Sequence, residues 1–351
     1  MIVIIPSNRD IRLDYFQPLL DTGARFIVVD DSEGSLKIDH PQFRVVTWKD
    51  QERMLGTDQI AIPRRNGACR DFGFYVAWKE SDDDEIIVAL DDDCKVEYSD
   101  FGERVAAVLS DKQRPVAKGQ GRHFNALDCY SNIESDVYPR GFPYADRATY
   151  QPWELVEEPH PEVLFNLGLW RGIFDVNAID KIKGPAYTYD DAKLKVPSAI
   201  APEGSLISVC SMNMHFRRKV IPAAYNFLMH VPVMPGWVVD RYGDIWGGFL
   251  LKTLMDINGD AMSVGEPMIR HLKEGNYTRN IWQEHTCHLL NDEFLELLEQ
   301  IREEVNPDTY VNIVSQATDV LDRGRESASE LLRRYLDVQV PGLRAWVRIL
   351  S

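Results

Sequence analysis

The chain has 351 residues, 44% of them hydrophobic and 27% charged, and its formal net charge is -16 at pH 7. This composition is that of a globular protein long enough for one large domain, or for one domain with an appendage. The acidic balance argues against a nucleic-acid partner, because a general nucleic-acid binder needs a basic surface. It leaves room for a local group of arginines that binds one phosphorylated small molecule.

The cysteines predict a reducing compartment. Their number is odd, they are widely spread and no CxxC pair occurs, so we expect free thiols, neither a disulfide framework nor a zinc site. The N-terminal apolar run lacks a preceding basic region and is too short for a signal peptide, and no apolar stretch is long enough to span a membrane. We therefore expect a cytoplasmic protein with no membrane partner. The cysteines are Cys69, Cys94, Cys129, Cys210 and Cys287.

The first part of the chain alternates apolar runs with helical spacing. Apolar runs at residues 2–5, 26–29, 43–47 and 86–90 predict buried strands. Helical patterns at 13–20, 69–76 and 101–110 fall between and after them. Strands and helices that alternate in this way predict an α/β fold with a doubly wound, mostly parallel sheet.

The later part of the chain becomes helical. Residues 114–152, rich in Gly, Pro, Tyr and Asp, predict short strands and loops. We expect further strands at 164–170, 206–214 and 262–265, and helices at 219–229, 240–257, 294–305 and 313–336. Asn306-Pro307-Asp308 separates the last two helices. We therefore expect an α/β domain over 1–280 and a helical C-terminal region over 281–351, which would serve packing, a lid or contacts in a homo-oligomer.

An acidic triplet ends the most apolar of the predicted strands. In EIIVALDDDC, residues 85–94, the apolar run stops abruptly at Asp91, Asp92 and Asp93. Adjacent carboxylates repel one another and are easiest to keep ionised beside a cation. Ligands of open α/β sheets bind outside the carboxyl ends of strands, where this triplet lies. A second triplet at 82–84 precedes the same strand, on the opposite edge, where we expect only a solvated turn.

The triplet and one histidine predict a divalent-cation site. Carboxylates are hard ligands that suit Mg²⁺ or Mn²⁺, and the triplet forms a DXD-type cluster. His271 follows the predicted strand at 262–265 and is the candidate second ligand, against the alternative of a histidine hydrogen-bonded in the core or on the surface. An imidazole ligand favours Mn²⁺. Asp92 lies between Asp91 and Asp93 on an extended chain and would point the other way, so we expect it to be structural or to contact the sugar or ribose of a substrate.

Several cations are candidates for binding phosphate. Arginine suits bidentate phosphate contacts, and the start of a helix after Gly67 adds backbone N–H donors, although a basic helix face is an equally good interpretation. Ser7 and Arg9 lie at the carboxyl end of the first strand, and Asp31 lies at that of the second. The further candidates are Arg64, Arg65, Arg70, Arg270 and Lys273.

Two polar residues stand out among glycines, prolines and aromatics. Arg140, in YPRGFPY, is placed on a loop, where substrate contacts are common. Asp244, in DRYGDIW, caps the following helix or reaches a sugar. The glycine motif Gly119-Gln120-Gly121 lacks a third glycine and follows no clear strand, so we expect no flavin or other dinucleotide.

These segments, in this order, resemble the reversibly glycosylated polypeptide family, which includes plant UDP-arabinopyranose mutases. The resemblance covers most of the chain up to about residue 284. The matching stretches are IPSNR at 5–9, ACRDFG at 68–73, DDDC at 91–94, RGFP at 140–143, NLGLWRGIFD at 166–175, PEGSLISVCSMNMHF at 202–216, DRYGDIWGG at 240–248 and GEPMIRH at 265–271.

The resemblance implies a GT-A-like nucleotide-sugar-binding catalytic domain over 1–280, a divalent cation and interconversion of pyranose and furanose forms of a nucleotide-linked sugar. Asp93 with Asp91 looks like the metal-binding acid, with His271 as partner. Arg140 matches the arginine that becomes glycosylated in the family, and Asp244 matches an acid that faces the sugar. Arg9, Asp31, Arg65 and Arg70 fall on the nucleotide side.

Departures from the family pattern leave the substrate open. The chain has Gly243-Asp244 where plant members have two adjacent acids, FNLGLW at 165–170 where they have SHGLW, and a longer passage, WELVEEPHPE, at 153–162. The substrate is therefore expected to be a UDP- or GDP-sugar. A glycosyltransferase with the same donor site, and a non-catalytic nucleotide-sugar-binding scaffold, are the competing interpretations.

Overall fold

The computed structural model describes residues 1–32, 34–119, 121–183, 187–273 and 275–351. Its framework is one large mixed sheet with the strand order β3-β2-β1-β4-β13-β9-β16-β11-β6-β8. The longest pairings, β1 with β2 and β9 with β16, are parallel. The strands of this order are β1 (Ile2–Ser7), β2 (Arg25–Asp30), β3 (Phe43–Val46), β4 (Ile86–Leu90), β6 (Val116–Lys118), β8 (Glu154–Val156), β9 (Val163–Ile173), β11 (Ser198–Ile200), β13 (Asn213–Arg217) and β16 (Ala261–His271).

The N-terminal strands are parallel, as the alternation of strand and helix predicts. β1 pairs with both β2 and β4, and β2 with β3, in the same direction. Helix α3 (Arg70–Glu80) packs on β1 and β2. Gly73 permits this close approach, because a Cβ there would lie 2.5 Å from Cγ2 of Ile4. The predicted strands at 2–5, 26–29, 43–47 and 86–90 are confirmed.

The second half of the sheet inserts an antiparallel strand. β13 runs antiparallel to its neighbours β4 and β9, while β16 lies parallel to β9. Two short strands extend it at the side: β5 (Cys94–Val96) pairs with β16, and β10 (Thr188–Tyr189) with β9. Because β5 follows the acidic triplet directly, this pairing brings the triplet beside the end of β16.

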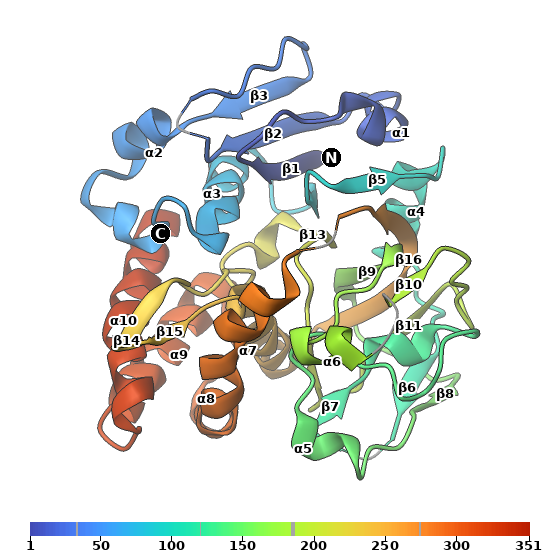
Figure 1. Ribbon diagram of the computed structural model, residues 1–351. Helices are drawn as coiled ribbons and strands as arrows, with labels where there is room; N and C mark the ends of the chain where they lie inside the picture. The colour runs from blue at the N-terminus through green and yellow to red at the C-terminus, as the bar shows by residue number, and fades with distance from the viewer. Residues whose placement is uncertain (33, 120, 184–186, 274) are drawn as a thin grey trace.

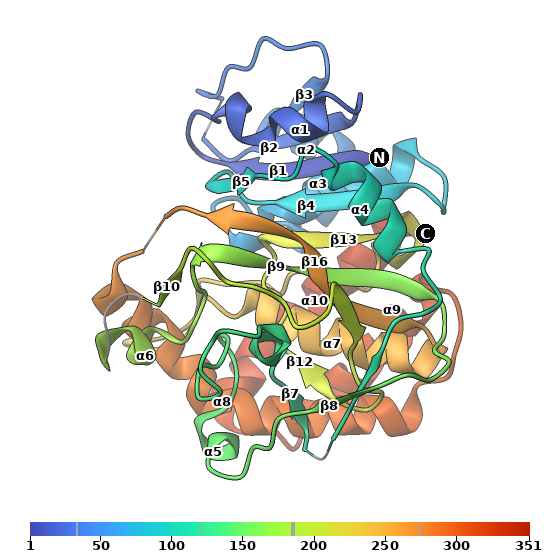
Figure 2. The same ribbon diagram turned by 90° about the vertical axis from the view of Figure 1, so that its right-hand side faces the viewer.

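Helices cover the sheet and fill one end of the molecule. In Figures 1 and 2 the C-terminal helices lie together with α7, while the N-terminal strands lie at the top of both views. The C-terminal helix α10 returns to the N-terminal half, where Nε1 of Trp78 donates to the Leu350 carbonyl at 3.0 Å. The longer helices are α2 (Trp48–Leu55), α4 (Phe101–Val108), α7 (Gly243–Asn258), α8 (Tyr277–Glu304), α9 (Tyr310–Gly324) and α10 (Glu330–Leu350).

Shorter elements connect these layers. The short helices are α1 (Gln17–Leu20), α5 (Tyr144–Arg147) and α6 (Ala178–Lys183), and the 3-10 helices include η2 (Gly56–Ala61), η3 (Gly67–Cys69) and η5 (Arg218–Val220). Two small sheets are formed by β7 (His123–Phe124) with β12 (Leu206–Ile207), and by β14 (Val231–Met234) with β15 (Trp237–Val239). Within the described ranges, the five cysteines are free and no helix is long and apolar enough to cross a membrane.

The fold is α/β with a large mixed sheet and C-terminal helices, as predicted, but some elements differ. The prediction of a helix at 219–229 is wrong for the residues that follow the short 3-10 helix η5. Backbone N–H groups of this segment bond to distant residues instead: Asn226 to Asp71 at 3.0 Å and Leu228 to Gln339 at 2.8 Å. These bonds replace a helical ladder.

Other differences have local causes. The polar residues at 48–54 form helix α2, which Thr47 and Asp50 start with a capping box. The helix predicted at 313–336 is interrupted after Gly324 and restarts with Ser329 as N-cap of α10. The strand predicted at 206–214 is two strands, β12 and β13. Gln120, in the middle of the glycine motif, lies outside the described residues.

Candidate active site

The carboxyl ends of β1, β2 and β4 meet at one edge of the sheet, and Asp92 is bound there by β1. Its carboxylate accepts a hydrogen bond from Oγ of Ser7 at 2.5 Å and from Nε of Arg9 at 2.9 Å, and it forms a second ion pair with Arg9. Both oxygens of Asp92 are therefore occupied by the residues that follow β1. Because Nη2 of Arg9 also donates to Asp93 at 3.1 Å, Asp92 and Asp93 share this arginine, and the prediction that Asp92 points away from Asp93 is wrong.

Asp91 faces the start of helix α3. Arg70 is only 2% exposed, donates to the Leu90 carbonyl at 3.1 Å and forms an ion pair with Asp91. Burial raises the pKa of Asp91, and the positive charge of Arg70 opposes that rise. Arg70 was predicted to bind diphosphate. In this structure it holds the acidic end of β4.

Asp93 and His271 are brought together by the pairing of β5 with β16. The Leu272 N–H donates to the Asp93 carbonyl at 3.1 Å, and Nε2 of His271 lies 4.0 Å from Oδ1 of Asp93. Nδ1 of His271 lies 2.7 Å from the Ile173 carbonyl oxygen. Since a carbonyl only accepts, Nδ1 carries the proton and Nε2 offers its lone pair toward Asp93.

The expected metal site is only partly assembled. Among the described residues, no group of three or more His, Cys, Asp or Glu is arranged to hold a metal ion. Asp91 is turned toward Arg70, and one oxygen of Asp93 accepts from Arg9 at 3.1 Å. Asp93 and His271 remain as a facing pair of donors, and they would be the residues to hold a divalent cation.

The side predicted to bind the nucleotide is arranged around Asp31. Oδ1 of Asp31 accepts from Nε1 of Trp48 at 2.9 Å and from the backbone N–H of Arg65 at 3.0 Å. Arg64 stacks over the Trp48 ring, with its guanidinium carbon 4.8 Å from the ring centroid. Lys273 is exposed two residues beyond His271. The nucleotide-binding roles of these side chains stay predictions.

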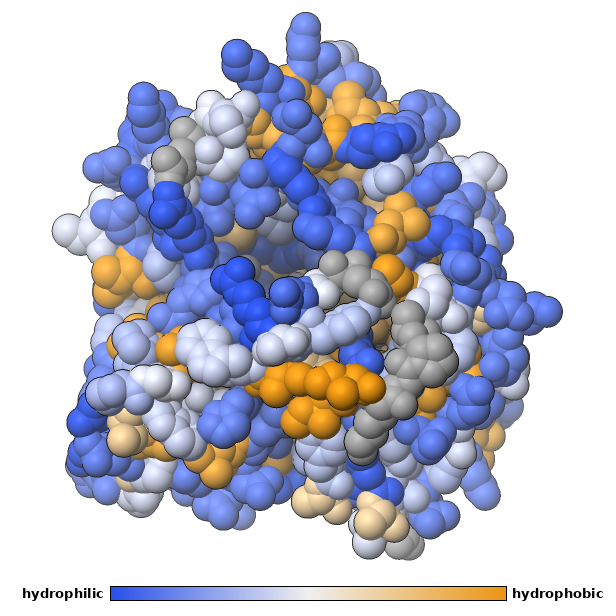
Figure 3. Space-filling model, in the orientation of Figure 1, coloured by the Kyte–Doolittle hydropathy of each residue, from blue (hydrophilic) through white to orange (hydrophobic). Residues whose placement is uncertain are grey.

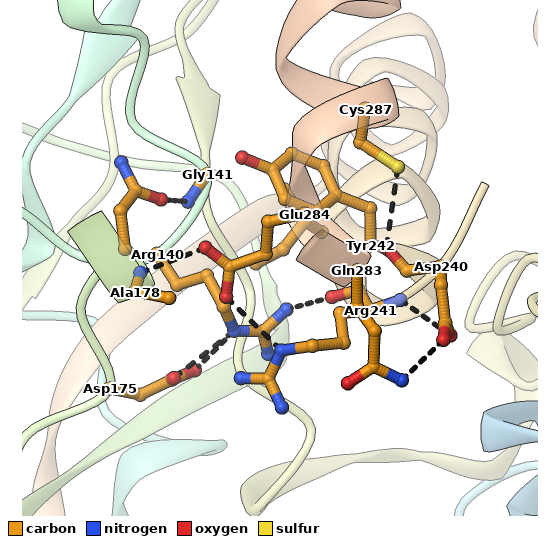
Figure 4. Close-up of polar contacts among 12 residues, drawn as sticks. Arg140, Gly141, Asp175, Ala178, Asp240, Arg241, Tyr242, Gln283, Glu284 and Cys287 are labelled. Carbon is orange, nitrogen blue, oxygen red and sulfur yellow. Dashed lines mark hydrogen bonds and ion pairs between the residues drawn. The ribbon is translucent and has the colours of Figure 1, made fainter. Parts of the chain in front are cut away.

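Arg140 lies in a second cluster, between two carboxylates. Nε of Arg140 donates to Asp175 at 2.9 Å, while Nη1 and Nη2 donate to the two oxygens of Asp244 at 3.1 and 2.7 Å. Nη1 also bonds to the Arg241 carbonyl, and Figure 4 shows Asp175 and Arg241 on different sides of the guanidinium. The sequence predicted Arg140 and Asp244 but missed Asp175, which could have been found as another acid shortly after a buried strand, β9.

Burial and charge oppose each other in this cluster. Burial alone would lower the pKa of Arg140, but Asp175 and Asp244 raise it well above its usual range. Burial alone would raise the pKa of Asp175, but Arg140, Lys181 and Arg241 lower it to about 2. The guanidinium is thus cationic and orients Asp244. Asp244 is not the cap of α7, because the N-cap position is Tyr242.

A cavity of about 290 Å³ lies against this cluster. Figure 3 shows that this face of the molecule is hollowed near its middle and that hydrophilic side chains border the hollow. Gly67 also lines the cavity. It lies three residues before Arg70, whose ion pair with Asp91 connects this wall of the cavity to the acidic end of β4. The residues that line the cavity include Gly67, Arg140, His230, Asp240, Arg241 and Asp244. A larger cavity of about 490 Å³, beside β6 and β11, contains none of the predicted site residues.

Helix α8 supports the Arg140 cluster through Glu284, another residue that the sequence analysis missed. Glu284 is 1% exposed and accepts from Nε of Arg241 at 3.1 Å and from the Ala178 N–H at 2.8 Å. Figure 4 shows Glu284 between these two partners. Burial alone would raise the pKa of Glu284, but His288, Arg241 and Arg140 lower it below its usual value. No local pattern marks this residue, because it lies on an ordinary helix.

Two solved structures show a weak similarity of fold to this chain. One is glucosyl-3-phosphoglycerate synthase from Mycobacterium tuberculosis, in complex with Mn²⁺, uridine-diphosphate and phosphoglyceric acid, with a TM-score of 0.39 and 14% identity over 83% of this chain and 77% of that one. Another is a mannosyltransferase from Pyrobaculum calidifontis, in complex with GDP-Man and Mn²⁺, with a TM-score of 0.31 and 12% identity over 99% and 86%. Scores this low say nothing about the chemistry of the present site.

Sequence relatives are closer. UDP-arabinopyranose mutase 1 of Arabidopsis thaliana is 30% identical over 81% of this chain and 74% of its own length. Probable UDP-arabinopyranose mutase 4 of the same plant is 25% identical over 98% and 89%. The family model for the reversibly glycosylated polypeptide matches residues 1–348. The chain therefore belongs to the reversibly glycosylated polypeptide family.

Proposed function

We propose that this protein is a divalent-cation-dependent, flavin-independent mutase that interconverts pyranose and furanose forms of a UDP- or GDP-linked sugar. Its family and its relatives named UDP-arabinopyranose mutase support a nucleotide-sugar substrate. The observation that carries the proposal is the buried Arg140, held between Asp175 and Asp244 on the wall of a cavity that also touches Gly67 in η3, just before α3.

In this proposal the nucleoside lies over the ends of β1 and β2. Asp31 and the backbone around Arg65 form one side of that region, and Ser7 and Arg9 the other. Lys273 lies beyond them and would reach a phosphate by rotating its flexible side chain. The diphosphate then lies over the acidic end of β4, and the sugar enters the cavity beside Arg140.

Asp93 and His271 would hold the cation, with Asp91 as a third ligand. The donor set fits Mn²⁺ and Mg²⁺: carboxylate oxygens with one imidazole whose proton is fixed on the far nitrogen by Ile173. When bound, the cation supplies Lewis-acid stabilisation of the diphosphate as it leaves C1. The imidazole favours Mn²⁺.

The chain's own residues position the sugar. The diphosphate departs from C1 with the electron pair of the C1–O bond, stays in place beside Arg9, and returns to C1 after the ring has changed size. Asp244 is fixed by Arg140 in one orientation, which fits it to accept a hydrogen bond from a sugar hydroxyl. Because the guanidinium of Arg140 is cationic, its role here is to orient Asp244 and to stabilise negative charge.

The proposal is tested by incubating the protein with Mn²⁺ and a panel of UDP- and GDP-sugars, without an acceptor, and by NMR of the product ring. A furanose isomer is the expected product, with UDP-linked pentoses first in the panel because of the names of the relatives. No furanose from any member of the panel would refute it. Transfer of the sugar to an added acceptor, with no isomerisation, would point to a glycosyltransferase instead.

A further inference from the structure

The hairpin of β14 and β15 brings a histidine and a carboxylate together at the cavity. Val231 pairs with Val239, so His230 just before the hairpin meets Asp240 just after it. Nδ1 of His230 lies 2.8 Å from Oδ2 of Asp240. Both residues line the same cavity as Arg140. Neither residue is among the site residues predicted from the sequence.

Asp240 is built into the protein as a fixed support. It is 4% exposed and accepts hydrogen bonds from Nε2 of Gln283 at 2.5 Å and from the Arg241 N–H at 2.8 Å. Figure 4 shows Asp240 between these two donors. The side chain of His230 is 51% exposed, so the imidazole faces the open cavity while the carboxylate stays behind it.

The backbone on both sides of this pair is unusual. His230 has φ of 58° and Arg241 has φ of 61°, and side-chain-bearing residues rarely adopt this left-handed region. A histidine that served only to pack would not need such a backbone with half of its ring exposed. Strain of this kind gathers at functional sites, where the surrounding structure holds a side chain in one direction.

The chemistry of the pair is that of an oriented base. A carboxylate on Nδ1 fixes the proton there and leaves the lone pair of Nε2 toward the cavity. The hydrogen bond that His230 donates to Asp240 raises the pKa of His230, against the effects of burial and of the positive charge of Arg279 from α8. The other charged groups that face this region are Arg140, Arg241 and Asp244 on the cavity wall and Glu284 behind Arg241.

We propose that His230, oriented by Asp240, is the acid–base residue that moves the proton between two oxygens of the sugar; this inference rests on the proposed mutase function. As the ring changes size, the hydroxyl oxygen that closes on C1 gives its proton to Nε2. The former ring oxygen breaks its bond to C1, keeps that electron pair and receives the proton back from Nε2. The histidine ends the cycle neutral, and no co-reactant is consumed.

Asp244 is less suited to this step. Both of its oxygens already accept hydrogen bonds from Arg140, so it orients a hydroxyl, while His230 lines the cavity with an exposed side chain and binds Asp240 through Nδ1 only. One imidazole that both takes and returns a proton matches a reaction in which one hydroxyl is consumed and another is formed.

The test compares His230→Gln, His230→Ala and Asp240→Asn with the intact protein, using the UDP- or GDP-sugar found to be isomerised. His285→Gln is the matched control, because His285 lies nearby, against the Trp237 ring, but is exposed and outside the cavity. We expect His230→Gln to lower kcat by about 100-fold or more, with the Kd for the nucleotide-sugar within about two-fold. Added imidazole should restore part of the activity of His230→Ala.

The pH profile adds a readout that a structural role would not change. With Asp240→Asn, the acidic limb of kcat should move to lower pH, because loss of the carboxylate lowers the pKa of the imidazole. If His230→Gln turns over within about three-fold of the intact protein, or if kcat falls with neither imidazole rescue nor a shifted limb, the inference is wrong. Absence of any isomerisation by the intact protein would instead refute the proposed function.

Discussion

Arg140 and Asp244 are 104 residues apart in the chain, yet they form a two-pronged ion pair with N–O distances of 3.1 and 2.7 Å. Asp175 binds the third nitrogen of the same guanidinium. The guanidinium thus pairs with the buried Asp175 and the partly buried Asp244. Such a cluster is a sensitive point of the fold as well as of the site, because removal of one partner leaves charge with less compensation in a partly buried environment.

Arg140→Ala should destabilise the protein by about 3–5 kcal/mol, because it leaves the buried Asp175 and the partly buried Asp244 without the guanidinium that pairs with both. Urea unfolding at pH 7, followed by circular dichroism, measures this loss. Arg12→Ala is the control, since its ion pair with Asp14 is exposed and should contribute little to stability. Equal effects of the two substitutions would show that the buried cluster contributes little.

Stability should fall between about pH 4 and pH 2 in part because of Asp175. Its pKa in the folded state is about 2, below the ordinary 3.8, so its contribution is complete above about pH 4 and is lost as the pH falls through 2. This difference corresponds to about 2 kcal/mol. Unfolding free energies measured across this range should fall less steeply for Asp175→Asn. Parallel curves for the two proteins would contradict the assignment.

Asp93→Asn and His271→Ala should each weaken Mn²⁺ binding by about ten-fold or more, in the presence of UDP or GDP, because each removes one of two facing donors. Electron paramagnetic resonance of free Mn²⁺ measures this binding directly. Asp84→Asn is the matched control from the other acidic triplet, where the carboxylate is exposed. Unchanged Mn²⁺ affinity in both site variants would remove these residues from the metal site.

Glu284→Gln should destabilise the protein by about 1–3 kcal/mol, because it removes the negative charge that accepts hydrogen bonds from Arg241 and from the Ala178 N–H. Thermal and urea unfolding measure this change. Glu303→Gln, on the exposed face of the same helix, should change stability by less than about 0.5 kcal/mol. If Glu284→Gln behaves like this control, helix α8 does not support the Arg140 cluster through that residue.

The sequence by itself determined the strands that build the sheet and the acidic ends that border the site. A strand buried on both faces must be continuously apolar, so residues 86–90 are recognisable without any knowledge of their neighbours. The end of such a strand is equally local. For that reason Asp91, Asp93 and Asp31 could be assigned to one edge of a parallel sheet, where the structure places them.

The tertiary structure decided which polar groups meet. Asp175, Glu284 and the pair of His230 with Asp240 stand in ordinary local sequence, and their partners lie on other elements. The same holds for residues 219–229, where backbone N–H groups donate to Asp71 and Gln339 in place of the helix that the spacing predicts. A local pattern of apolar residues shows which face of a strand or helix is buried. A hydrogen bond or an ion pair across many residues is set only when the sheet and its covering helices have come together.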